Sequence, residues 1–254
     1  MKGYGNYDKY PELKIDGFET WQGYANIADE LRRRAKGKKR FVIVFDCYPE
    51  VDQAEVWKGL SALGAEWFFS DDAMMDQAAY NAMICPFVTD DRVFGVMNTL
   101  KLTDVLDADK ANDMRGEIAA RTGLICVIGV GASLVAQGDL LVYLDLARWE
   151  IQCRFAKGLP NWRTENSDAG KLAKFKQGFF VEWRMADRHK RTLMNRADYL
   201  LDTNRANDPK MVSGEGWRVG LERFATRPFR LVPYFAPEVW GGQWMKEVCD
   251  LDRS

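Results

Sequence analysis

Five short apolar runs, separated by segments with helical periodicity, constrain the fold of this chain more than any other feature of its sequence. The runs span residues 41–46, 66–71, 124–129, 140–145 and 198–202. Continuous runs of β-branched and aromatic residues are typical of strands that a parallel sheet buries on both faces. Because helical patterns alternate with these runs, we predict an α/β fold with a mainly parallel sheet flanked by helices.

The segments between the runs carry the helical patterns. The first places Trp21, Tyr24, Ala28 and Leu31 at spacings of three and four residues, as one face of a helix requires. We expect helices over residues 21–35, 51–64, about 147–156 and 178–196. We also expect residues 73–120 to be mainly helical, with an interruption around Pro86 and the Asp90–Asp91 turn.

Composition excludes several classes of function. The chain has 254 residues, 47% of them hydrophobic, and a formal net charge of −1, so no overall field attracts nucleic acid or anionic membranes. Its five cysteines form no CxxC pair, which favours a reducing compartment. The first residues contain no apolar signal segment. We therefore expect a cytoplasmic protein whose partner is a small molecule, with no nucleic acid and no membrane.

Aspartates end four of the five predicted strands. They are Asp46, Asp71 (followed by Asp72), Asp145 and Asp202. Ligands of open parallel sheets bind outside the carboxyl ends of the strands. A cluster of carboxylates there needs Mg²⁺, a sugar or nearby arginines to offset its repulsion. Each aspartate alone is equally typical of a helix cap or a turn, but the set of four favours a polar ligand crevice.

The remaining predicted strand, residues 124–129, ends in a glycine loop, GVGAS, with Gly129, Gly131 and Ser133. Backbone N–H groups of such a loop can bind a phosphate. The loop has no lysine, however, unlike the GxxxxGK[ST] phosphate loop. A tight turn is the alternative interpretation.

Two basic stretches follow. Arg148 and Arg154 lie in ARWEIQCR, where the spacing of Glu150 and Arg154 predicts a surface ion pair on a helix. The only histidine, His189, lies among cations in RMADRHKR. We interpret it as a surface residue rather than a catalytic base. We find no metal site among these residues, since one histidine cannot form a His-rich one.

The order of these elements resembles the uridine-kinase-like branch of the P-loop nucleoside kinases. The resemblance implies that Arg148 and Arg154 belong to a lid, and that Asp71 or Asp72 lies near the acceptor hydroxyl. The chain departs from that family after the first strand, where it reads DCYPEVD. That segment has three carboxylates and neither the glycines nor the lysine of a phosphate loop. We therefore expect no ordinary phosphotransfer from ATP.

A second resemblance covers nearly the whole chain. The segments FDCYPEVD, GVGASLV, DLARWEIQ, FFVEWRMADRHK, LDTN and RPFRLVPYFAPEVWGGQWMKEV are similar to the front half of long bacterial class I mannose-6-phosphate isomerases. In those proteins a kinase-like region precedes a cupin domain. The resemblance implies that residues 1–230 are the kinase-like domain and that residues 231–254 begin the cupin. It also implies a zinc site that only the missing cupin would hold.

Three hypotheses remain open at this stage. The first is a kinase-like domain of sugar-phosphate metabolism that binds a sugar phosphate or a nucleoside-like ligand. The second is an active enzyme, either an isomerase joined to a cupin domain or an atypical nucleoside or sugar kinase. The third is a protein-interaction module, which the nine tryptophans would suit. The candidate ligand-binding residues are Asp46, Asp71, Asp72, Gly129, Gly131, Ser133, Asp145, Arg148, Arg154 and Asp202.

Overall fold

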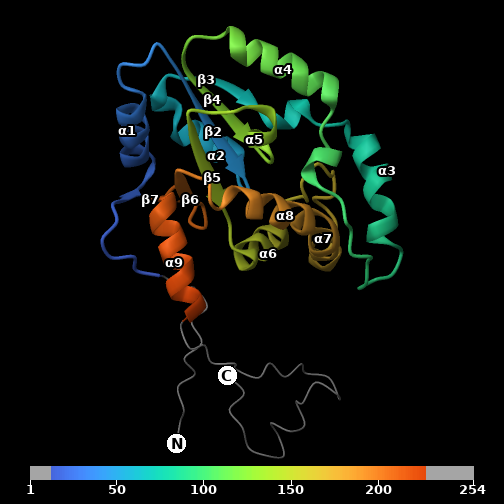
Figure 1. Cartoon of the computed structure of the whole chain (residues 1–254). Helices are drawn as coiled ribbons and strands as arrows, with labels where there is room; N and C mark the ends of the chain where they lie inside the picture. Colours follow the sequence, from blue (N-terminus) through green and yellow to red (C-terminus); the bar gives the residue numbers. More distant parts are fainter. Residues whose placement is uncertain (1–12, 227–254) are drawn as a thin grey trace, which may run out of the picture. The chain divides into compact units, whose positions relative to one another are not determined.

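A computed structural model describes residues 13–226, of which Ile15–Val219 form one compact unit. Its centre is a seven-stranded sheet in the order β1-β7-β6-β5-β2-β4-β3. The strands are β1 (Thr20–Gln22), β2 (Arg40–Cys47), β3 (Glu66–Phe69), β4 (Gly123–Gly129), β5 (Leu140–Asp145), β6 (Tyr199–Asp202) and β7 (Lys210–Ser213). The predicted α/β fold is confirmed, since β2 to β6 pair in parallel and helices cover the sheet (Figure 1).

Nine α-helices connect and cover the strands in the described part of the chain. They are α1 (Tyr24–Ala35), α2 (Gln53–Gly59), α3 (Gln77–Val88), α4 (Ala108–Ala120), α5 (Ala132–Val135), α6 (Arg148–Ala156), α7 (Lys171–Gln177), α8 (Trp183–Leu193) and α9 (Gly214–Thr226). A π-helical segment, Gly178–Glu182, joins α7 to α8. Short 3₁₀ turns, η1 to η3, cover Ser61–Leu63, Ser70–Ala73 and Leu102–Asp104.

Several predicted boundaries are wrong, each for a local reason. Residues Thr20–Gln22 pair with β7 as an edge strand rather than starting a helix, and Gly23, with φ of +78°, turns the chain into α1. The second predicted strand, residues 66–71, stops at Phe69, so Asp71 lies in a 3₁₀ turn. The predicted interruption around Pro86 and the Asp90–Asp91 turn is present, since α3 ends at Val88 and the next helical turn begins at Leu102.

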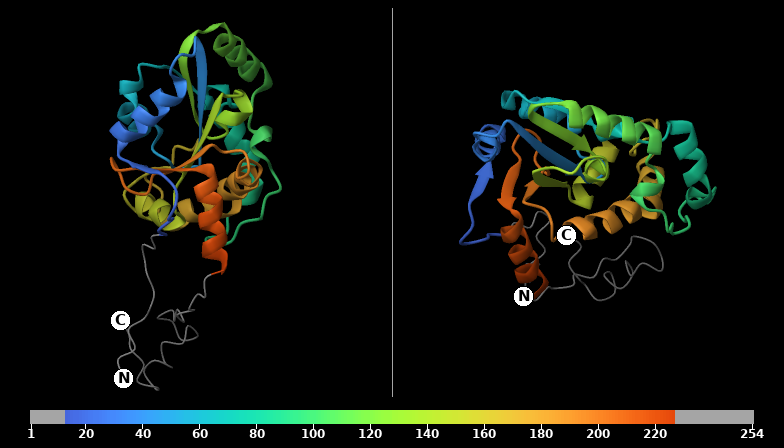
Figure 2. Two further views of the ribbon diagram at one scale, coloured as in Figure 1. Left: turned by 60° about the vertical axis from the view of Figure 1, so that its left-hand side comes forward. Right: turned by 45° about the horizontal axis from the view of Figure 1, so that its top comes forward.

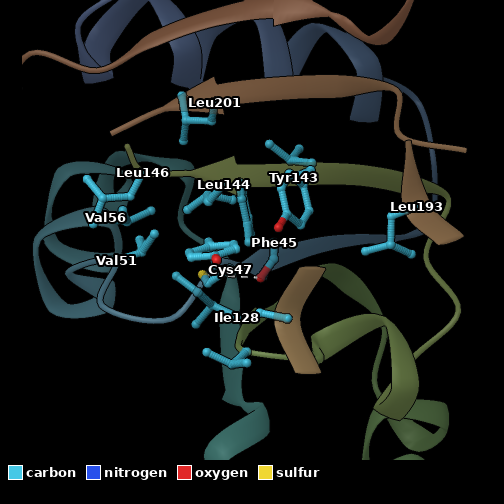
Figure 3. Packing of buried hydrophobic residues seen from close by; sticks show 14 of the residues in the cluster. Phe45, Cys47, Val51, Val56, Ile128, Tyr143, Leu144, Leu146, Leu193 and Leu201 are labelled. Carbon is cyan, nitrogen blue, oxygen red and sulfur yellow. Dashed lines mark hydrogen bonds between the residues drawn. The ribbon is translucent and has the colours of Figure 1, made fainter. Parts of the chain in front are cut away.

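Two hydrophobic clusters pack on the two faces of the sheet. Alternate residues of β2 divide between them, with Ile43 and Phe45 on one face and Val42 and Val44 on the other. Helices α1 and α2 cover the first face, and α4 and α5 cover the second (Figures 1 and 2). Figure 3 shows the first cluster around Cys47, where side chains of β2, β4 and β5 meet those of α2 and the loop before it. Because β2 is buried on both faces, its backbone is held in place, and the side chains at its carboxyl end are held with it.

The helices α6, α7 and α8 lie together beyond the carboxyl ends of the central strands (Figure 1). Trp183 of α8 is fully buried and stacks on Phe155 of α6, with ring centroids 6.5 Å apart. Contacts of this kind fix α8 across the edge of the sheet at which the predicted aspartates lie.

The glycine loop yields a stability prediction. A Cβ added to Gly129 would lie 2.2 Å from Oγ of Ser70, and its φ of +141° is one that other residues rarely adopt. We expect Gly129→Ala to lower the free energy of unfolding by about 1–3 kcal/mol. Gly116→Ala, in the exposed middle of α4 with open space around it, should raise it by about 0.5–1 kcal/mol. Urea denaturation measures both, and shifts of the same sign would contradict the loop geometry.

Candidate functional site

A cavity of about 360 Å³ lies beyond the carboxyl ends of β5 and β6. We call it the edge cavity. It is lined by Tyr48, Asp145, Leu146, Ala147, Arg148, Asp187, Lys190, Leu200, Asp202 and Asn204. Asp145 and Asp202 end the two strands and lie in register with each other. The structure therefore brings three predicted residues together here: Asp145, Arg148 and Asp202.

Ion pairs organise the charges of the edge cavity. Lys190 Nζ lies 2.5 Å from Asp145 Oδ2, and Arg148 Nη2 lies 2.5 Å from Asp187 Oδ2. The hydroxyl of Tyr48 donates to the other oxygen of Asp187 over 3.0 Å. Burial raises the pKa of the Tyr48 phenol, so this group stays a hydrogen-bond donor. The two cations thus each have a fixed partner and a fixed position.

Aromatic rings hold the same two cations from behind. The ammonium group of Lys190 lies 5.8 Å from the ring centroid of Tyr48, 5.5 Å from that of Tyr143 and 5.9 Å from that of Trp217. The guanidinium group of Arg148 lies 5.0 Å from the ring of Trp183. Cation–π contacts of this kind favour one orientation of each cation. Arg148 is therefore a wall of the cavity, not part of a solvated helix face.

A second group forms around Asp46, at the end of β2. Oδ2 of Asp46 accepts hydrogen bonds from the backbone N–H of Ser133 over 2.9 Å and from its hydroxyl over 2.6 Å. Nε2 of His189 lies 2.9 Å from the same oxygen and 3.3 Å from Oγ of Ser133. Two predicted residues, Asp46 and Ser133, are thus in direct contact.

The interpretation of His189 as a surface residue is wrong. Its side chain is only 9% exposed, because α8 lays it against the fully buried Asp46. Nothing in the local sequence indicates this burial, since the residues next to His189 are all charged. The GVGAS loop does not offer the N–H of Ser133 to a phosphate, because this group already donates a hydrogen bond to Asp46.

Residues 46–52, which end β2 and form the loop after it, are held by contacts within the protein. Asp52 accepts a hydrogen bond from the N–H of Glu55 over 2.9 Å, so it caps the start of α2. A helix N-terminus that already holds a carboxylate is a poor site for a phosphate. Asp52 is therefore a helix cap and not a residue of a ligand crevice.

Glu50, in the same loop, is buried against Glu182 at the end of the π-helical segment. The two carboxyl groups lie close enough for the charge of one to act on the other. Oε1 of Glu50 has no hydrogen-bond donor within residues 13–226, which favours a proton on one member of the pair. Burial raises the pKa of Glu50 to about 7. Burial, together with the charge of Glu50, raises the pKa of Glu182 well above its ordinary value. Both shifts favour a proton on the pair at neutral pH.

Neighbouring donors fix the pair in place. Asn161 Nδ2 and Gln177 Nε2 each donate to a different oxygen of Glu182 over 2.7 Å. The indole N–H of Trp183 donates to Oε2 of Glu50 over 3.3 Å. Since Trp183 also stacks under Arg148, the pair lies directly behind one wall of the edge cavity.

The remaining predicted residues do not join the edge cavity. Oδ1 of Asp71 accepts from the indole of Trp162 and Oδ2 from the amide of Gln53, each over 2.8 Å. Asp72 is exposed. Arg154 forms the predicted ion pair with Glu150 and also donates to the backbone oxygens of Glu50 and Thr203. Arg154 thus braces the loop after β2 instead of reaching a ligand.

Sequence reasoning missed several residues of these sites. Tyr48, Asp187 and Lys190 line the edge cavity only because α8 crosses the sheet edge. Glu182 could have been found, since it lies inside the apolar run FFVEW. No group of three or more His, Cys, Asp or Glu residues within residues 13–226 is arranged to hold a metal ion.

Comparison with known proteins places the chain in a family. The family described as a domain of unknown function, DUF8485, matches residues 23–226. The chain belongs to this family. No curated protein matches it. None of its helices in the described part is long and apolar enough to cross a membrane.

One solved structure with a similar backbone is a candidate fructose transport system kinase from Silicibacter sp. TM1040. The two share 12% sequence identity with a TM-score of 0.42, over 65% of this chain and 94% of the other. A similarity of this size transfers no function. The predicted relation to mannose-6-phosphate isomerases stays a prediction, and residues 231–254 lie outside the described residues.

The Glu50–Glu182 pair predicts how stability depends on pH. Carboxyl groups with a raised pKa bind more protons in the folded state than in the unfolded state, so stability falls as pH rises above about 4.5. The loss continues through pH 7, at up to about 1.4 kcal/mol per pH unit for each proton. Glu182→Gln should flatten this decline between pH 5 and 8, measured by chemical denaturation.

The matched control for this measurement is Glu117→Gln, which changes an exposed glutamate on α4. Its curve of unfolding free energy against pH should run parallel to that of the parent protein. A Glu182→Gln curve that also runs parallel to the parent would show that the buried pair holds no extra proton.

Proposed function

We propose that this chain binds a hydroxyl-rich small molecule, of the sugar, sugar-phosphate or nucleoside kind, in the edge cavity, and that it does not carry out ordinary phosphotransfer from ATP. The observation that carries the proposal is the convergence of Asp145, Arg148 and Asp202 on one cavity at the carboxyl edge of the sheet. That edge is where α/β sheets bind their ligands. The volume of about 360 Å³ suits a small ligand.

The charges of the cavity favour hydroxyl groups over a free phosphate. Two cations, Arg148 and Lys190, face three carboxylates, Asp145, Asp187 and Asp202, so the formal charge is +2 − 3 = −1. Carboxylates accept hydrogen bonds from hydroxyls, and a charge-assisted bond contributes about 1.5–3 kcal/mol. A phosphate dianion would have to draw Arg148 or Lys190 away from its carboxylate. A sugar or a nucleoside therefore suits the cavity better than its phosphate ester.

Residues 46–52 support the part of the proposal that excludes ordinary phosphotransfer from ATP. Their three carboxylates are Asp46, which is bonded to Ser133 and His189, Glu50, which is buried, and Asp52, which caps α2. Residues 46–52 contain no lysine for the phosphates of ATP, and the N–H of Glu55 at the start of α2 already donates to Asp52. Mg²⁺-ATP would meet carboxylates where a kinase presents donors.

A thermal-shift screen tests the proposal. We expect a rise in melting temperature with fructose, mannose or a nucleoside, a smaller rise with the 6-phosphates of the two sugars, and none with Mg²⁺-ATP. Asp145→Asn and Arg148→Ala should each weaken binding about tenfold or more, since each removes a charge-assisted bond. Arg191→Ala, an exposed arginine next to Lys190 on α8, is the matched control and should bind like the parent.

Two results would contradict the proposal. If none of the sugars, sugar phosphates or nucleosides raises the melting temperature of the parent protein, the aspartates act only as helix caps and turn residues. Micromolar affinity for Mg²⁺-ATP by calorimetry would restore the kinase interpretation, with Arg148 as a lid residue.

A further inference from the structure

A second, smaller cavity of about 190 Å³ lies beside the centre of the sheet. We call it the serine cavity. Ser133, Gln137 and Arg196 are among its lining residues, and Val44 and Leu141 of neighbouring strands form its floor. It shares no lining residue with the edge cavity. Any chemistry there is independent of the ligand proposed above.

The hydroxyl of Ser133 is bonded to a base. It donates to Oδ2 of Asp46 over 2.6 Å, within the range expected of a nucleophile and its general base. Asp46 is fully buried, and its Oδ1 has no hydrogen-bond partner within residues 13–226. On Oδ2 the Ser133 hydroxyl shares the negative charge of Asp46 with the Ser133 N–H and with Nε2 of His189.

His189 orients that base. Its Nε2 faces both Asp46 and Ser133, so the ring does not stand between them as it does in a Ser–His–Asp relay, where one nitrogen faces the serine and the other the aspartate. An Nε2–H would donate to Asp46 and fix its carboxylate toward Ser133. The geometry makes Asp46 the base and His189 the positioning residue.

Donors for a developing oxyanion face the same cavity. The side chains of Arg196 and Gln137 line it and have no hydrogen-bond partner in the part of the chain that the structure describes. Asp198, the other charged lining residue, already accepts from the N–H of Leu141 over 2.8 Å. A carbonyl oxygen that gains negative charge would find cationic and amide donors here.

We propose that Ser133 is a nucleophile that hydrolyses small carboxylic esters in the serine cavity. A bond forms between Ser133 Oγ and the acyl carbon while the hydroxyl proton passes to Asp46. The bond from the acyl carbon to the alcohol oxygen then breaks, and the alcohol leaves with that proton. Water attacks the acyl-serine and returns one proton, through Asp46, to Ser133. The sum is ester plus water giving acid plus alcohol. The volume of the cavity restricts the acyl group to a few carbons.

Reaction with p-nitrophenyl acetate tests the proposal. The parent protein should release nitrophenol and gain the mass of one acetyl group, and peptide mapping should place that group on Ser133. Ser133→Ala should lose both signals. Asp46→Asn should slow acylation by about 10²–10⁴-fold. If Asp46→Asn does not fold, Arg196→Ala tests the donors to the oxyanion, and the acylation rate should fall about tenfold or more.

Ser70→Ala is the matched control. Ser70 is fully buried and donates to the backbone oxygen of Val130 in the same loop, but it does not line the cavity. This variant should be acetylated like the parent. Absence of an acetyl group on the parent's Ser133, or equal nitrophenol release by parent and Ser133→Ala, would overturn the proposal.

Discussion

Burial of two carboxylates, Asp46 at the end of β2 and Glu50 in the loop after it, is the constraint on which the rest of this structure depends. A charged group is taken out of water only when something compensates it. Asp46 is compensated by hydrogen bonds from Ser133 and His189, and Glu50 by protonation, which its burial favours. Asp52, which is exposed, accepts a hydrogen bond from the N–H of Glu55 and caps α2. These contacts make residues 46–52 an element of the structure.

Helix α8 connects this loop to both cavities. Over one turn it presents Asp187 and Lys190 to the edge cavity and His189 to Asp46. Its position depends on Trp183, which is fully buried and touches Glu50, Phe155 and Arg148. A change in the protonation of the Glu50–Glu182 pair would therefore act on the helix that lines the proposed ligand site.

The sequence predicted the centre of the fold well because the central strands are buried on both faces. Continuous apolar runs mark such strands, and their carboxyl ends share one edge, so the placement of Asp145 beside Asp202 followed. The edge strand Thr20–Gln22 and its neighbour Lys210–Ser213 were missed because they are short and partly exposed. Their pairing is a contact between distant parts of the chain.

The candidate sites were predicted only in part for the same reason. Lys190, Asp187 and His189 reach their sites through the path of α8, which local sequence does not encode. The charges around His189 are typical of a solvated face, and the structure shows instead a side chain inserted against a buried carboxylate. Glu182 is the exception, because an acid inside an apolar run predicts burial and hence a bound proton.

Infrared spectroscopy of the Glu50–Glu182 pair tests this account most directly, since a neutral carboxylic acid absorbs in a region where carboxylates do not. With glutamate labelled at the side-chain carboxyl carbon, the folded protein at pH 7 should show a protonated glutamate band that shifts with the label. Glu182→Gln should abolish that band, and Glu117→Gln should leave it unchanged. A parent protein without the band at pH 7, with both glutamates ionised, would contradict the claim that a shared proton holds the loop after β2 in place.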